Sequence, residues 1–134
     1  MADTNKIHLN IITPDRVFFE GDVDMVEFNT TEGEIGILPG HVPLTVIIKP
    51  GILMLHEGEE VREAALHSGF VEILPDRVTI LAEIVEWPGE IDEERAEAAY
   101  NRAKERIANH APETNMLRAE AALLRAMARI EVLK

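Results

Sequence analysis

The residues most able to do chemistry are six arginines in the last third of the chain. They form two sets with the same spacing of seven and then four residues: Arg95, Arg102 and Arg106, and then Arg118, Arg125 and Arg129. On an α-helix this spacing places each set on one face. If two such faces turned together, the guanidiniums would converge and hold a polyanion. The alternative is an ordinary solvated surface, with the arginines paired to Glu94, Glu105 or Glu120.

Other chemistries lack the residues that they need. Ser68 is the only serine, and His67 beside it would point to the opposite face of a strand, so the two do not form a nucleophile and base. The five histidines show no metal-ligand spacing, and we interpret them as scattered surface or loop residues. No glycine precedes Lys-Ser or Lys-Thr, so a Walker-type phosphate loop is missing. We expect no catalytic residue and no metal site.

The formal net charge of -12 is unevenly spread. Residues 1–87 carry 16 acidic and 5 basic side chains, a net of -11, whereas residues 88–134 carry 9 and 8, a net of -1. This acidic balance makes a nucleic-acid partner unfavourable, because nucleic acids bind to basic faces. The C-terminal part is the half better suited to meet an anion or an acidic partner.

Two further absences bear on location. There is no cysteine, so no disulfide holds the fold, which fits a reducing cytoplasm. The first residues show no basic segment followed by an apolar run, and no stretch reaches the length of a membrane span. We therefore expect any contact with a membrane to go through other proteins.

The elements that would position the arginines follow from a change of hydrophobic period at Trp87-Pro88-Gly89. Before this joint, apolar residues alternate and turn residues recur at short intervals, which predicts eight to ten short strands in a sandwich or flattened barrel. Residues 32–41, rich in glycine and proline, are interpreted as a connection under one end of the core. The prediction is a β-sandwich domain over residues 1–87 and a helical domain over residues 88–134, with Trp87 covering their junction.

After the joint, apolar residues recur every three or four positions, which predicts helices over about residues 92–108 and 114–132. Asp92 fits an N-cap, Pro112 lies where the second helix would start, and the short connection favours an antiparallel hairpin. The predicted interface residues are Ala96, Ala99, Ala103 and Ile107 on the first helix and Leu117, Ala121, Leu124 and Ala128 on the second. Because alanine buries little area, we expect this hairpin to depend on what it touches.

Four sequence motifs, taken in order, resemble the epsilon subunits of F-type ATP synthases. They lie at residues 36–44, 68–72, 76–82 and 118–127, and the resemblance extends over essentially the whole chain. It implies a β body plus an α tail: a flattened ten-stranded β-sandwich followed by an antiparallel two-helix hairpin. It also implies a non-catalytic rotor subunit of the central stalk, held peripherally at the cytoplasmic face of the bacterial cell membrane.

The resemblance further implies partners. The sandwich would bind the gamma subunit and sit on the c-ring, so that proton-driven rotation is coupled to ATP synthesis. The helical pair would either fold against the sandwich or extend along gamma to the alpha and beta subunits and inhibit ATP hydrolysis.

In bacterial members of the family, the folded hairpin binds ATP as a regulatory ligand through a motif Ile/Leu-Asp-x-x-Arg-Ala, which residues 91–96 match. The implied ligand-binding residues are Glu86, Ile91, Asp92, Arg95, Ala96, Arg102, Arg125 and Arg129. We expect the start of the first helix on the base and ribose side, and the last three arginines on the phosphates. Magnesium beside the nucleotide is compatible with the sequence but not required by it.

Two other interpretations stay open on the residues alone. The first is a stand-alone β-sandwich adaptor for a peptide or small ligand, with an oligomerising helical tail. The second is an enzyme acting on a nucleotide. Co-purification with a gamma-type coiled coil would separate the first from a rotor subunit, and an ATPase assay would reveal the second.

Overall fold

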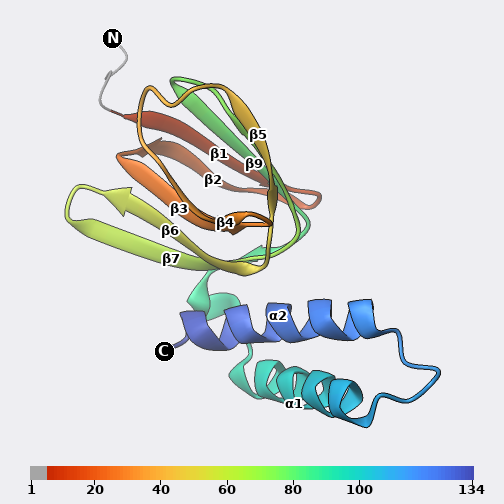
Figure 1. The fold of residues 1–134 in the computed structure, drawn as a ribbon. Helices are drawn as coiled ribbons and strands as arrows, with labels where there is room; N and C mark the ends of the chain where they lie inside the picture. The colour runs from red at the N-terminus through yellow and green to blue at the C-terminus, as the bar shows by residue number, and fades with distance from the viewer. Residues whose placement is uncertain (1–5) are drawn as a thin grey trace.

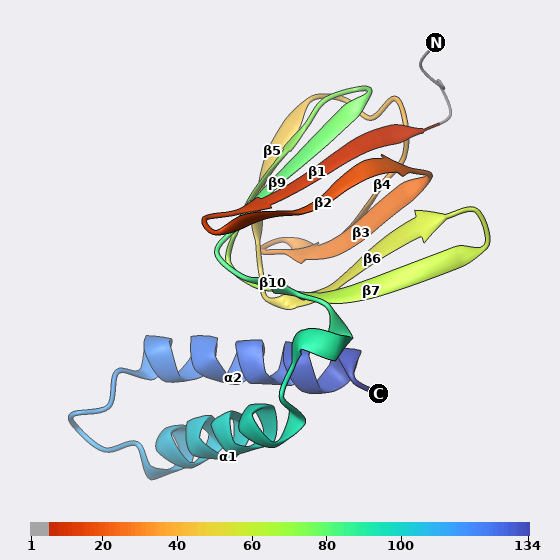
Figure 2. The same ribbon diagram turned by 180° about the vertical axis from the view of Figure 1, so that it is seen from behind.

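The computed structural model describes residues 6–134, which form a layered β body with two helices lying beneath it (Figures 1 and 2). The strands are β1 Ile7–Thr13, β2 Arg16–Val23, β3 Met25–Thr30, β4 Gly33–Ile37, β5 Leu44–Ile48, β6 Gly51–Glu57, β7 Glu60–Leu66, β8 Gly69–Ile73, β9 Arg77–Ala82 and β10 Val85–Glu86. A 3-10 helix, η1, covers Pro88–Glu90, and the α-helices are α1 Glu93–Asn109 and α2 Met116–Val132.

The ten strands of the described chain are hydrogen-bonded into one continuous sheet that folds back on itself. Its order is β10-β7-β6-β3-β5-β8-β9-β1-β2, and β4 pairs with β3 beside this path. All the pairs are antiparallel except β1 with β9. The predicted ten-stranded sandwich is thereby confirmed.

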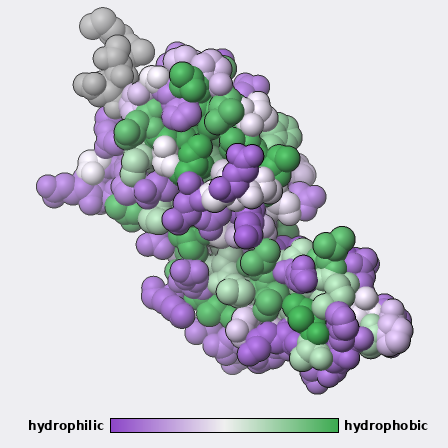
Figure 3. Space-filling model, viewed as in Figure 1, coloured by the Kyte–Doolittle hydropathy of each residue, from purple (hydrophilic) through white to green (hydrophobic). Residues whose placement is uncertain are grey.

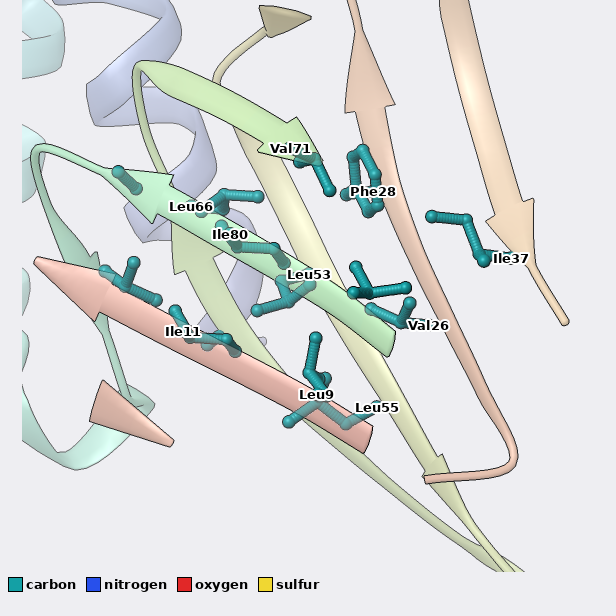
Figure 4. Packing of buried hydrophobic residues seen from close by; sticks show 14 of the residues in the cluster. Leu9, Ile11, Val26, Phe28, Ile37, Leu53, Leu55, Leu66, Val71 and Ile80 are labelled. Carbon is teal, nitrogen blue, oxygen red and sulfur yellow. The ribbon is translucent and has the colours of Figure 1, made fainter. Parts of the chain in front are cut away.

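The core lies between the two layers, where alternate strand residues point inward. In β1, every second residue from Ile7 to Thr13 is buried. Leu9 and Ile11 of β1 meet Leu53 and Leu55 of β6 across the interior, and all four are fully buried (Figure 4). Large aliphatic side chains thus fill the sandwich.

The prediction for residues 32–41 is wrong in part. Gly33–Ile37 forms β4, which pairs with β3 from Val26↔Ile37 to Thr30↔Gly33, and Ile37 is fully buried. Glycines at positions 33 and 36 weaken the intrinsic strand preference, but the ladder to β3 and the burial of Ile37 outweigh it. Leu38, which follows β4 in the same segment, is 57% exposed, so this residue does not lie under the core.

The helix ends are set by side chains. Asp92 caps α1, as predicted, since its carboxylate accepts a hydrogen bond from the Arg95 amide at 3.2 Å. Asn115 caps α2 in the same way through the Arg118 amide at 3.1 Å, so α2 begins after Asn115 rather than near Pro112. At the end of α1, His110 adopts a left-handed conformation with φ of 51°.

The two helices run antiparallel, with α2 lying between α1 and the sandwich (Figures 1 and 2). On α1 the predicted interface is confirmed, with Ala96 and Ala103 buried. On α2 it is wrong in part: Ala128 is buried as predicted, but Leu117 is 79% exposed, and Ala119 and Ala126, which the prediction left out, are buried. The physical reason is that α2 packs on two sides, against α1 and against β6 and β7, so no single apolar stripe describes it.

Candidate functional site

A groove opens where the sandwich, the joint and both helices meet, and we call it the hinge groove. It has a volume of about 290 Å³, at the lower end of the range of small-molecule sites, which is roughly 300–1,000 Å³. Its lining residues are Glu86 from β10, Glu90 from η1, Ile91 and Asp92 from the joint, Arg95, Ala96, Ala99 and Arg102 from α1, and Arg129 from α2. A ligand in this groove would contact the sandwich, the joint and both helices.

Glu86 connects the sandwich to α2 at the floor of this groove. Its Oε1 accepts a hydrogen bond from Arg129 Nε at 2.7 Å and lies 3.1 Å from His67 Nε2. Burial raises the pKa of Glu86, but the hydrogen bonds and positive charge of His67 and Arg129 outweigh burial and hold this pKa below its ordinary value. Glu86 is therefore a carboxylate at neutral pH, and it ties the sandwich edge to the last turns of α2.

His67 corrects a prediction from the sequence. It was interpreted as a surface or loop residue, yet its side chain is 1% exposed, and its Nδ1 has no hydrogen-bond partner in the part of the chain that the structure describes. The β10–β7 pairing brings Glu86 opposite Ala65, two residues before His67, which explains the burial. No motif in the sequence could have signalled it.

The joint itself is fixed by ring stacking and an ion pair. Trp87 stacks on Phe18 with 4.4 Å between ring centroids, and the Arg62 guanidinium lies 4.1 Å over the Trp87 ring. Arg16 pairs with Glu90 at 2.8 Å, and its hydrogen bond lowers the pKa of the Glu90 carboxyl. Trp87 thus covers the junction, as predicted. The two glutamates that line the groove, Glu86 and Glu90, are both paired with arginines.

The matched motif at residues 91–96 has clear local roles. Ile91 is extended, with φ of -96° and ψ of 129°, and leads the chain from η1 to the cap of α1. Ala96 is buried because α1 approaches its neighbour closely there. Arg95 and Arg102 stand two turns apart on one face of α1 and line the groove, and neither side chain has a partner within residues 6–134.

A second groove lies further along the same side of the hairpin, and we call it the loop-end groove. It has a volume of about 600 Å³ and is lined by Arg106 of α1 and by Arg118 and Arg125 of α2, among others. Arg106 follows Arg102 by one helical turn, and Arg125 precedes Arg129 by one turn, so the two grooves are successive along the facing arginine rows.

The structure therefore brings seven of the eight predicted site residues together and separates one. Glu86, the four motif residues, Arg102 and Arg129 line the hinge groove, whereas Arg125 lines the loop-end groove. The alternative pairing with Glu94, Glu105 or Glu120 does not occur: in the described part of the chain, no salt bridge joins these glutamates to the six arginines. Sequence reasoning missed Glu90 and Ala99, although Ala99 lies three residues after Ala96 on the same helix face.

Residues 6–134 offer neither a metal site nor a membrane-spanning helix. No group of three or more His, Asp or Glu side chains is placed to hold a metal ion. None of the helices there is long and apolar enough to cross a bilayer.

The fold defines a class of proteins in which a β-sandwich domain is followed by a domain of two helices. A separate family model matches each of these two domains. The model described as ATP synthase, Delta/Epsilon chain, beta-sandwich domain matches residues 6–88, and the model of the long alpha-helix domain of the same chain matches residues 90–134. The chain belongs to the ATP synthase delta/epsilon chain family, which confirms the resemblance found in the sequence.

The proteins most similar in sequence that we compared belong to the same family. The ATP synthase epsilon chain of Halalkalibacterium halodurans is 47% identical over 127 residues, covering 94% of this chain and 96% of the relative. That of Caldanaerobacter subterraneus is 44% identical over 126 residues, covering 93% and 91%. Among solved structures, a chain of the Euglena gracilis mitochondrial ATP synthase, in an assembly of OSCP, F1 and c-ring, has a TM-score of 0.82 at 24% identity, covering 97% of this chain and 82% of that chain.

Proposed function

We propose that this chain is the rotor subunit that joins the central stalk of a bacterial F-type ATP synthase and regulates it without catalysing a reaction itself. Its full-length similarity to bacterial epsilon chains supports this role. In the proposal the protein is held peripherally at the cytoplasmic face of the membrane, through the gamma subunit and the c-ring.

An exposed apolar row on the sandwich supports docking to a protein partner. The strand registers put Ile47 of β5 beside Phe70 of β8, Phe70 beside Leu81 of β9, Leu81 beside Ile12 of β1, and Ile12 beside Val17 of β2. Exposures of 62% for Ile47, 46% for Phe70 and 59% for Val17 are high for side chains of this size. Hydrophobic residues are also more abundant over the upper sandwich than over the β6–β7 turn (Figure 3). We assign this row to the gamma subunit.

In the proposal, ATP binds in the hinge groove and regulates the hairpin. The observation that carries this is the convergence of β10, η1, α1 and α2 on one groove in which two guanidiniums, those of Arg95 and Arg102, lack a partner among residues 6–134. The base and ribose would lie near Ile91 and Ala96, and the phosphates would accept hydrogen bonds from Arg102 and Arg129. Arg125 lies one turn beyond Arg129, on the side where the terminal phosphate would extend.

A ligand that contacts all of these elements binds the folded hairpin and not the extended one, so it stabilises the folded form. At a hundred times its dissociation constant it contributes about 2.7 kcal/mol, whereas reversing a 1:99 population takes about 5.5 kcal/mol. ATP would therefore switch the hairpin only if its folded and extended forms are close in energy. In the extended form, the freed helices would contact the alpha and beta subunits and inhibit ATP hydrolysis.

Isothermal titration of ATP into the purified chain, with and without magnesium, tests the ligand. We expect Arg102→Ala to weaken binding at least tenfold. Lys104→Ala is the matched control, because it removes a positive charge from the same helix at a position that lines neither groove. Equal affinity in Arg102→Ala and the unmodified chain would contradict the assignment.

Co-purification with the gamma subunit tests the docking row. Phe70→Glu places a charge at the centre of the row on an exposed side chain, so the fold should persist while the complex is lost. If the Phe70→Glu variant still co-purifies with gamma, the row is not the docking surface. If the unmodified chain does not co-purify with gamma, the stand-alone adaptor becomes the better interpretation.

A further inference from the structure

His67 is the only ionisable side chain among the buried residues of the described chain, and the proposed function gives it no role. It follows β7, and its backbone N–H donates to the Ile84 carbonyl at 3.1 Å, which fixes where the ring starts. The imidazole is 1% exposed, its Nε2 lies 3.1 Å from Glu86 Oε1, and its Nδ1 has no hydrogen-bond partner within residues 6–134. The ring therefore makes a single polar contact with the described chain, and that contact is with Glu86.

The direction of this hydrogen bond follows from its acceptor. The pKa of Glu86 is held below its ordinary value, so Glu86 is a carboxylate at neutral pH and can only accept. His67 Nε2 must then carry the hydrogen and donate it. A buried imidazole with one nitrogen unpaired is less favourable than an apolar side chain of similar size. What the imidazole adds at this position is the hydrogen bond to Glu86, so the role of His67 depends on what Glu86 does.

Glu86 in turn orients Arg129. The same oxygen, Oε1, accepts a hydrogen bond from Arg129 Nε at 2.7 Å, and Arg129 lines the hinge groove. The N–H groups on the two Nη atoms of Arg129 have no hydrogen-bond partner within residues 6–134. Because Nε is held, the planar guanidinium has a fixed orientation and presents its Nη groups together, as bidentate binding of a phosphate requires.

We propose that His67 is the positioning residue of the hinge: through Glu86 it sets the orientation of Arg129, and with it the fit of α2 against the sandwich and the affinity of the hinge groove for nucleotide phosphates. Since two donors share Glu86 Oε1, loss of the His67 donor frees the carboxylate to rotate and takes Arg129 with it. The part that concerns phosphates rests on the proposed ATP site, whereas the part that concerns α2 does not.

Two substitutions separate the hydrogen bond from packing. The amide nitrogen of His67→Gln can take the place of Nε2 and donate to Glu86, whereas that of His67→Asn takes the place of Nδ1 and falls short of Glu86. In the full chain without ligand, hydrogen exchange of the α2 amides around Arg129 should be about tenfold faster in His67→Asn and close to native in His67→Gln. Equal exchange in the two variants, whether native or accelerated, would overturn the proposal, because it would leave the ring with a packing role only.

A measurement on the native histidine keeps the test decisive if His67→Asn folds poorly. Nuclear magnetic resonance of the imidazole nitrogens should find the hydrogen of His67 on Nε2, and Glu86→Gln should shift this signal. Glu131→Gln is the matched control and should leave the signal unchanged, because it removes an exposed carboxylate of α2 that does not line the hinge groove. A hydrogen missing from Nε2, or a signal indifferent to Glu86→Gln, would contradict the proposal.

Isothermal titration of ATP tests the part that concerns phosphates. His67→Asn should weaken binding about fivefold, and His67→Gln should not. In a Glu86→Gln background, His67→Asn should cause no further loss, since His67 acts through Glu86. Equal affinity in the unmodified chain and His67→Asn, or an additive loss in the double variant, would overturn this part. If the unmodified chain binds no ATP, the proposed ATP site fails, while the exchange data still decide the role of His67 in seating α2.

Discussion

The sandwich and the hairpin bury different kinds of side chain, and we expect them to differ in stability for this reason. The sandwich encloses leucine, isoleucine, valine and phenylalanine, with Phe28 the largest of its fully buried side chains. The hairpin buries mainly alanine, together with Val132 near its end. Because stabilisation scales with apolar area at roughly 25 cal/mol per Å², we expect the sandwich core to contribute more stability than the interface between the helices, and we expect the hairpin to rely on added contacts.

The hairpin is held to the sandwich by the packing of α2 against β6 and β7 and by a small number of polar contacts. Arg129 and Glu86 form the single ion pair between α2 and the strands within residues 6–134. Arg16 and Glu90 secure η1. In the proposed function, the helices change position while the sandwich keeps its own fold, which requires that the hairpin be held less strongly than the sandwich core.

The largest expected effect comes from a large-to-small substitution in the sandwich core. Leu55 is fully buried, so Leu55→Ala should lower the free energy of unfolding by about 2–5 kcal/mol through lost transfer energy and the cavity left behind. Urea denaturation measures it. The matched change in the hairpin, at half-buried Leu124, should cost less than half as much; equal losses would contradict the contrast between the two regions.

Removing the ion pair at the hinge should have the next largest effect. Arg129→Ala leaves Glu86 with His67 as its only hydrogen-bond partner within residues 6–134. It should weaken the docking of α2 by about 1–2 kcal/mol, because solvent screens a pair whose side chains are both partly exposed. Hydrogen exchange of the α2 amides reports the change. In a double-mutant cycle with Glu86→Gln, additive effects would show that the pair contributes no coupling energy.

Acid should loosen the same contact. Because the pKa of Glu86 is lower in the folded protein than in the unfolded chain, its contribution is complete above the unfolded value, about 4.3, and is lost as the pH falls through the folded pKa. Trp87, the only tryptophan, lies at the joint, so its fluorescence should change in that acid range. The change should be absent in Glu86→Gln and present in Glu90→Gln; the reverse would assign it to the Arg16 pair.

The smallest expected effect is a gain. His110 holds a left-handed conformation at the end of α1, where glycine is favoured. His110→Gly should stabilise the hairpin by up to about 1 kcal/mol, leave the sandwich unaffected, and slow amide exchange in the last turn of α1. If exchange there became faster, the left-handed residue would not be the weak point of the turn.

The sequence predicted most of the fold because its signals are local. Alternation in β1 and the switch of period after Trp87 located the strands, the joint and the helices. The sequence-based prediction failed where contacts between distant residues determine the structure. β4 forms because β3 lies beside it, and Leu117 is exposed because α2 packs on two sides. Of the candidate site, the arginine spacing predicted one row on each helix but left open whether the two rows face each other. That arrangement, and the division of the rows into two grooves, depends on how the helices align, which no short motif encodes.

Residue-resolved hydrogen exchange, with and without saturating ATP, is the most direct test of the central claim that ATP stabilises the hairpin through the hinge groove. At a hundred times the dissociation constant, the amides of α1 and α2 should exchange about a hundredfold more slowly, while those of β1 and β6 should not change. Unchanged exchange in both helices, or equal slowing in helices and strands, would contradict it.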